Sequence, residues 1–139
     1  MSRSEFTVRL ESSISQIPPE QWDALTDGGN PFVGHAFLSA LEDSGSTGGN
    51  SGWQPAPLLI DGADGRLAAA LPAWIKAHSQ GEYVFDQSWA DAWRRAGGHY
   101  YPKLQIAVPF TPATGPRVLT RDPALAAPLL RAAEQLCAA

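Results

Sequence analysis

The chain has 139 residues, of which 44% are hydrophobic and 17% are charged, and this favours a single globular domain. Its formal net charge is −4, with only two lysines against eight arginines, so it has no general attraction to nucleic acid or to anionic membranes. The single cysteine, Cys137, excludes an internal disulfide and a cysteine-rich zinc site.

The N-terminal residues predict a location for the protein. They alternate polar and apolar residues and contain no long apolar run of the kind found in a signal peptide. No stretch of the chain is apolar for long enough to span a membrane. A lone cysteine suits a reducing compartment. We therefore expect a cytoplasmic protein that does not insert into membranes.

The first third of the chain predicts a strand and two helices. Residues 6–10 alternate at a period of two, which is typical of a strand. Prolines open a short helix over residues 18–25. A second helix is predicted over residues 30–44, with Asn30 as its N-cap and Pro31 at its first position. The glycine-rich residues 44–52 are predicted to be an internal loop.

The middle of the chain predicts antiparallel strands. Residues 53–60 and 66–76 are apolar runs separated by DGADG, which indicates a hairpin whose prolines cause bulges or edge positions. Residues 82–85 predict a brief strand. Asp86 then caps a helix that carries Trp89 and Trp93, which we expect in the core. The nearby pair of Asp91 and Arg95 is expected on the surface.

The last third predicts a strand over residues 103–108, a proline-rich loop over 109–116 and a final helix capped by Asp122. The apolar stripe of this helix continues to Cys137, which we expect to be a buried small hydrophobe, or exposed where the neighbouring segments of the domain are missing. The predicted fold class is α/β in the mixed α+β sense, with a central, mostly antiparallel sheet flanked by helices.

The final helix has a consequence for the sheet. A strand followed by an amphipathic helix normally leads into a further strand. We therefore expect residues 1–139 to be the N-terminal portion of a domain that is truncated before its last strands. Such a sheet ends on an unpaired edge, which favours self-association.

Four stretches of the sequence are similar to a known family. They are NPFVGHAFLSALEDSGS (30–46), GWQP (52–55), KAHSQGEYVFDQSWADAWRRAG (76–97) and YYPKLQIAVPFTPATGPRVL (100–119). These stretches resemble the FemAB-like proteins of the GNAT (acyl-CoA N-acyltransferase) superfamily, which are often labelled peptidoglycan biosynthesis or recognition proteins. The resemblance implies a GNAT-like fold, of which this chain supplies the front part of the first of two tandem halves.

The resemblance also implies a place for an acyl donor, in the loop of residues 108–117. The residues expected to hold it are Thr111, Thr114, Gly115 and Arg117. Acyl-CoA and aminoacyl-tRNA are both open as the donor, and no other cofactor is required. The loop departs from the family's usual glycine- and arginine-rich pattern, and its prolines remove donor amides. A rigid structural turn is therefore the alternative interpretation.

Acyl transfer to an amine needs a base and groups that position the acceptor. His78 and Glu82 are the candidates for the base, whereas Asp86 is favoured as a helix cap. The alternative for Glu82 is a solvated side chain or an ion pair with Arg94 or Arg95. Tyr101 and Lys103 are candidates for binding the amine-bearing substrate, with packing as their alternative role.

Other candidates for chemistry are weak. His35 is expected to be structural, and no group of His, Asp or Glu has the spacing of a metal site. We therefore expect an N-acyltransferase or aminoacyltransferase acting on an amine in peptidoglycan metabolism, with this portion inactive alone. The alternative is a non-catalytic GNAT-like recognition or assembly module.

Overall fold

A computed structural model describes residues 7–77, 87–99, 101–109 and 115–138. Its helices are α1 (Pro19–Asp23), α2 (His35–Asp43), α3 (Gln87–Arg95) and α4 (Ala126–Ala138), with 3-10 turns η1 (Pro31–Val33) and η2 (Pro123–Leu125). Its strands are β1 (Val8–Leu10), β2 (Trp53–Pro55), β3 (Leu58–Asp61), β4 (Leu67–Leu71), β5 (Trp74–Lys76), β6 (Lys103–Gln105) and β7 (Leu119–Thr120). The predicted strand over 82–85 and the predicted cap Asp86 lie outside the described residues.

The strands form two antiparallel sheets that share one long hairpin. One sheet has the order β1-β3-β4-β7 and the other the order β2-β5-β6. Each arm of the hairpin passes from one sheet to the other. At the junction between the sheets the two arms stay hydrogen-bonded, since the amide of Ala56 donates to the carbonyl of Ala73 (2.8 Å). Pro57 and Pro72 lie at this junction and cannot donate, so the ladder breaks there. The predicted mixed α/β fold with an antiparallel sheet is confirmed.

The segment after β6 differs from the prediction. β6 pairs with β5, and β7 pairs with β4, so both lie along the same arm of the hairpin. The chain leaves the sheet after Gln105 and returns to it at Leu119, and the described parts of this excursion are residues 106–109 and 115–118. The strand predicted over 103–108 therefore ends at Gln105, and the loop at 108–117 leads into β7 rather than directly into the last helix. Prolines at 109 and 116 explain the interruption, because neither can donate to a ladder.

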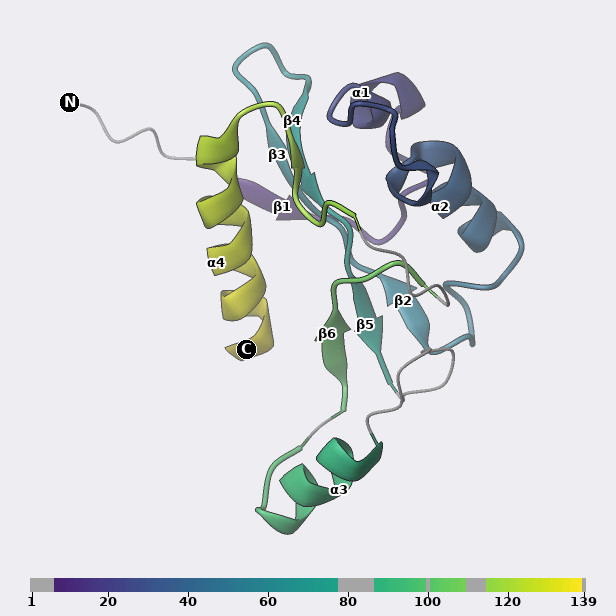
Figure 1. The fold of residues 1–139 in the computed structure, drawn as a ribbon, viewed down its shortest axis with the longest axis vertical. Helices are drawn as coiled ribbons and strands as arrows, with labels where there is room; N and C mark the ends of the chain where they lie inside the picture. The colour runs from purple at the N-terminus through teal and green to yellow at the C-terminus, as the bar shows by residue number, and fades with distance from the viewer. Residues whose placement is uncertain (1–6, 78–86, 100, 110–114, 139) are drawn as a thin grey trace, which may run out of the picture.

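Helices cover both faces of the four-stranded sheet, with α4 on one face and α1 and α2 on the other (Figure 1). Side-chain alternation along β3 divides the core between these faces. Leu58 and Ile60 pack in one cluster with Leu129 of α4, whereas Leu59 belongs to the cluster that contains Trp22 of α1.

The face covered by α1 and α2 is rich in aromatic residues. Trp22 is fully buried, and its indole N–H donates to the carbonyl of Val33 (2.8 Å). Trp53 and Trp74 meet edge to face, with ring centroids 6.1 Å apart. His35 is buried, and its Nε2 lies 2.9 Å from the carbonyl of Ile14, in accord with the expected structural role.

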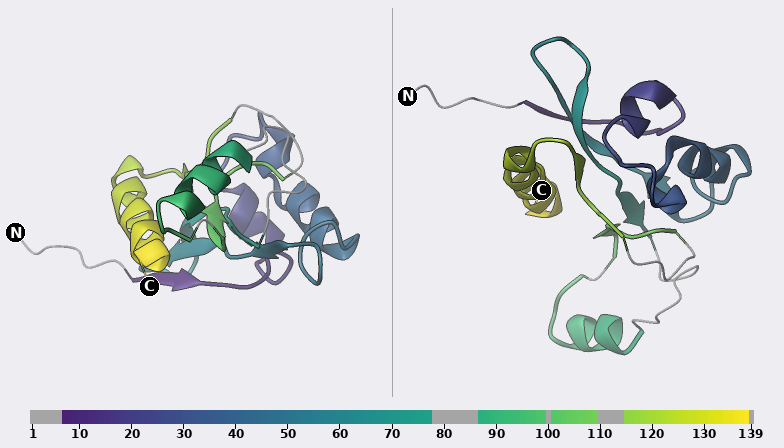
Figure 2. Two further views of the ribbon diagram at one scale, coloured as in Figure 1. Left: turned by 90° about the horizontal axis from the view of Figure 1, so that it is seen from below. Right: turned by 45° about the horizontal axis from the view of Figure 1, so that its top comes forward.

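Helix α3 lies away from these layers (Figures 1 and 2). Trp93 is 57% exposed, so its predicted place in the core is wrong. The indole of Trp93 lies against Gly98, just beyond the helix. Asp91 pairs with Arg94 (3.4 Å) rather than with Arg95, whose Nε donates to the carbonyl of Asp91. The side chain of Trp89 lies outside the described part of the chain.

The last turn of α4 also differs from the prediction. Leu129 and Ala133 are buried, but Cys137, at the next position of the same stripe, is exposed. Of the two expectations for this thiol, burial is wrong and exposure is observed, since none of the described segments covers that turn. Among the described residues, no helix has the length and apolar character needed to cross a membrane.

Candidate ligand site around Gly115 and Arg117

The predicted site residues fall into two groups. His78, Glu82, Thr111 and Thr114 lie outside the described residues, so their roles stay predictions. Gly115, Arg117, Tyr101 and Lys103 are described. The structure brings Gly115 and Arg117 into contact, and it separately brings Tyr101 and Lys103 into contact.

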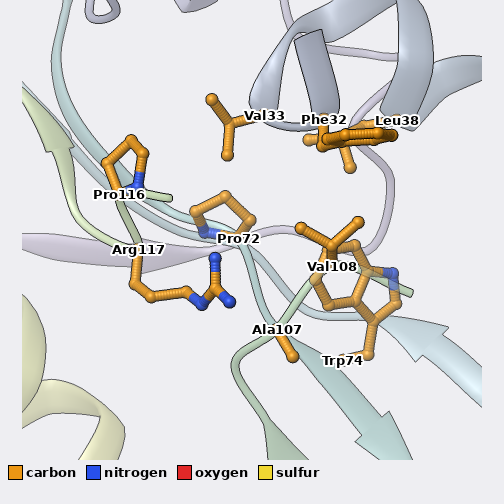
Figure 3. A pocket seen from close by; sticks show the side chains of 9 residues that line it. All are labelled: Phe32, Val33, Leu38, Pro72, Trp74, Ala107, Val108, Pro116 and Arg117. Atoms are coloured by element: carbon orange, nitrogen blue, oxygen red, sulfur yellow. The ribbon is translucent and has the colours of Figure 1, made fainter. Parts of the chain in front are cut away.

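The described parts of the excursion, residues 106–109 and 115–118, line a small apolar cavity against the hairpin and η1 (Figure 3). Three parts of the chain supply its lining: Phe32, Val33 and Leu38 from η1 and α2; Pro72 and Trp74 from the hairpin; Ala107, Val108, Pro116 and Arg117 from the excursion. The cavity volume is about 10 Å³, which is room for about one water molecule.

Arg117 supplies the one charged side chain among the residues that line this cavity. Its side chain extends from the excursion toward the middle of the lining residues, beside Pro72 (Figure 3). Its Nη1 donates to the carbonyl of Gly115 (3.3 Å), which ties the guanidinium to its own segment. A guanidinium beside apolar walls attracts an anion more strongly than one in water, because the local dielectric constant is lower.

A second, open hollow of about 430 Å³ lies on the other side of residues 115–117. The loop between α1 and η1 and the segment through β7 to Arg121 form its walls. Val33 and Pro116 line both spaces. The 115–117 segment is therefore a partition between a small apolar cavity and a larger, more open hollow.

Arg121 stands at the edge of the open hollow but already has partners. Its Nε donates to the carbonyl of Ala24 (2.9 Å) and its Nη2 to that of Thr26 (2.6 Å), just past the end of α1. It satisfies carbonyls that a short helix leaves unpaired, so it braces α1 against the segment after β7. Sequence reasoning missed this role, because the partners are more than 90 positions away and no local pattern marks them.

The start of the last helix is not an open anion site. The carboxylate of Asp122 accepts the amide of Ala124 (3.0 Å), as the predicted cap requires, and Pro123 has no amide to offer. The structure thus confirms Asp122 as a cap. Charged groups for a ligand must come from elsewhere, and Arg117 is the nearest one that the sequence predicted.

Tyr101 and Lys103 lie at the far end of the three-stranded sheet. The Nζ of Lys103 is 5.8 Å from the Tyr101 ring. Lys103 is also directly opposite Lys76 in the β5–β6 ladder, so the two lysines of the chain share one row. Lys76 is fully buried, and its Nζ lies 3.9 Å from the centroid of a Trp53 ring. Sequence reasoning missed Lys76, although a single lysine at the end of an apolar run is a signal for a buried cation.

A family model for FemAB-like proteins, described as peptidoglycan biosynthesis/recognition, matches residues 13–139. The chain belongs to the FemAB-like family. Membership implies a peptidoglycan-related role. Neither the curated proteins nor the solved structures give a match.

Among the described residues, no group of three or more His, Cys, Asp or Glu side chains could hold a metal ion.

Proposed function

We propose that this FemAB-like chain is part of an N-acyltransferase or aminoacyltransferase that acts on an amine in peptidoglycan metabolism. The observation that supports it best is Arg117, a guanidinium held beside an apolar cavity in a segment that leaves the sheet and returns. An acyl donor combines an apolar or carbonyl part with an anionic part. The apolar cavity suits the first part, and the guanidinium of Arg117 suits the second.

The reaction assigns a role to each predicted residue. The nitrogen of the acceptor amine attacks the acyl carbon, a C–N bond forms, and the bond from that carbon to the donor's sulfur or oxygen breaks. The proton released from nitrogen passes to a base, for which His78 and Glu82 are proposed. Arg117 and the amides near Gly115 would hold the anionic part of the donor, either acyl-CoA or aminoacyl-tRNA. Tyr101 and Lys103 would contact the acceptor.

A non-catalytic recognition module is the second candidate. It is favoured by the size of the cavity, which at about 10 Å³ does not accommodate an acyl group without movement of its walls. The prolines at 109, 112 and 116 also remove amides that could bind an anion.

Ligand titration separates the two candidates. Coenzyme A thioesters and aminoacyl donors are added in turn to the protein, and thermal unfolding is followed. A ligand at 100 times its Kd stabilises the folded state by about 2.7 kcal/mol. We expect stabilisation that Arg117→Ala abolishes, whereas Arg66→Ala, in the exposed hairpin turn, leaves it unchanged.

Transfer is measured next, with a labelled donor and an amine-bearing peptidoglycan precursor. Donor binding with transfer supports the enzyme. A folded protein that binds precursor but no donor would establish the recognition module instead. We also propose that residues 1–139 are inactive alone, in which case this chain binds a donor without transferring its acyl group.

Self-association is proposed through the edge of β7, the terminal strand in the order β1-β3-β4-β7. Light scattering over a range of concentrations tests it. A dimer that Leu119→Pro disrupts, in a variant whose circular dichroism shows that it is still folded, would support the edge, and a monomer at high concentration would contradict it.

A further inference from the structure

Asn30 has a role that neither the sequence pattern nor the family assigns. Its Oδ1 accepts the amide of Phe32 (3.0 Å), which makes it the N-cap of η1. The other end of the same amide group, Nδ2, lies against Gly115, where it occupies the space that a Cβ would need. One side chain thus joins the start of η1 to a segment 85 positions away.

The contact explains why residue 115 is a glycine. Its backbone is not among those with a positive φ, so no conformational requirement selects glycine there. A methyl group at this position would overlap Asn30 Nδ2, so the Asn30 side chain would have to leave its place or one of the two segments would have to move. The close approach is therefore possible only without a side chain at 115.

The segment that Asn30 contacts is the partition between the two spaces. Gly115 accepts the hydrogen bond from Arg117 through its carbonyl, so the position of Gly115 sets that of the guanidinium. Pro116, between them, lines both the apolar cavity and the open hollow. Fixing residue 115 consequently fixes the wall of the cavity and the charge beside it.

We propose that Asn30 is a positioning residue, which holds the Gly115–Arg117 segment in place and thereby sets where Arg117 meets an anionic ligand. This rests on the proposed function only in giving Arg117 a ligand to bind. The structural part of the inference is measured without any ligand.

Two substitutions separate the two ends of the Asn30 side chain. Asn30→Ser keeps an N-cap oxygen but removes the atoms that contact Gly115, and Asn30→Asp keeps the cap and the shape while removing the N–H donors. Asn50→Ser, in an exposed loop, is the matched control. Thermal unfolding and residue-resolved amide exchange are measured for each protein.

We expect Asn30→Ser to change the Tm by less than about 2 °C, because the cap is retained. The amides of Gly115, Arg117 and Val118 should exchange at least about 10-fold faster, with no change in Asn50→Ser. Unchanged exchange at these three amides in Asn30→Ser would overturn the proposal.

Gly115→Ala provides an independent check. In the native background its methyl overlaps Asn30, and we expect a Tm lower by about 4 °C or more. In the Asn30→Ser background the same change should cost less than half as much, whereas the Asn30→Asp background should keep the full loss. An equal loss in all three backgrounds would contradict a contact between these residues.

The ligand readout uses coenzyme A and inorganic pyrophosphate as probes. Asn30→Ser should weaken probe binding at least about 10-fold at an unchanged Tm, and unchanged binding would overturn the functional half of the proposal. If the native protein binds neither probe, the proposed donor site is wrong. The exchange and Gly115→Ala results then still decide whether Asn30 holds the segment.

Discussion

Helices α3 and α4 carry similar patterns and have different surroundings. Both have apolar residues at a spacing of four, Trp89 and Trp93 in α3 and Leu129 and Ala133 in α4. In α4 these two residues are buried against the sheet, with exposed fractions of 0% and 6%. In α3, Trp93 is 57% exposed and residues 91–97 are all exposed, although Ala90 is buried.

The difference lies in what each helix follows. Helix α4 comes directly after β7 and η2, so it begins beside the four-stranded sheet and runs back across it. There it packs on the face that carries Leu58 and Ile60. Helix α3 lies between β5 and β6, two strands that pair with each other, and it stands beyond the end of their sheet (Figure 1). An amphipathic pattern predicts a helix, but the connection determines whether a surface is present to cover it.

The largest effect is expected where an aromatic side chain is fully enclosed. Trp22→Ala removes a buried indole and its hydrogen bond to Val33, and should lower the free energy of unfolding by about 4 kcal/mol. Denaturant titration measures the loss. A loss below about 1 kcal/mol would mean that the face covered by α1 does not pack as described.

The next effect tests the packed helix itself. Leu129→Ala should cost about 3 kcal/mol, because Leu129 has no exposed surface and a cavity would remain against the sheet. Leu130→Ala, its 46% exposed neighbour, is the matched control and should cost less than about 1 kcal/mol. Equal losses at the two positions would contradict the orientation of α4.

A pair of arginines extends the comparison to polar contacts. Arg121 bonds to carbonyls beyond the end of α1, whereas Nε of Arg95 bonds to a carbonyl in its own helix. Arg121→Ala should cost about 1 kcal/mol, with solvent exposure reducing the full value of charged hydrogen bonds. Arg95→Ala should cost only a few tenths of a kcal/mol. Chemical denaturation of both variants checks this, and a larger loss at Arg95 would reverse the comparison.

The contrast between contacts within one segment and contacts between distant segments shows what the sequence can predict. Caps and periods are local, so the cap Asp122, the hairpin and the Leu129–Ala133 part of the α4 stripe could be read from the sequence, and the structure confirms them. Asn30 is also a cap, but of η1 alone, because extended backbone at Gly34 divides the helix predicted over 30–44 into η1 and α2. Pairings between distant segments carry no local signal. The placement of β6 and β7 along one hairpin arm, the brace at Arg121 and the fit of Asn30 against Gly115 belong to this class.

The candidate site was predicted less completely for the same reason. Sequence and resemblance drew attention to Gly115 and Arg117, and the structure joins them through a hydrogen bond. The cavity beside Arg117 could not be predicted, since its walls come from η1, the hairpin junction and the excursion, three segments that only the tertiary fold brings together. The burial of Lys76 could not be predicted either, because lysine side chains are usually solvated.

The smallest effect is expected at Trp93, and it is the most direct test of the exposed helix. Trp93→Ala should change the free energy of unfolding by about 0.5 kcal/mol or less, since the indole is 57% exposed and alanine has the higher helix propensity. The fluorescence of the native protein supplies a second readout. A 57% exposed indole is accessible to iodide, so the quenchable fraction of the emission should fall in Trp93→Ala, whereas the emission of the buried Trp22, Trp53 and Trp74 should stay protected. A loss of about 3 kcal/mol or more, with no change in quenching, would show that Trp93 is covered in solution and that α3 packs as α4 does.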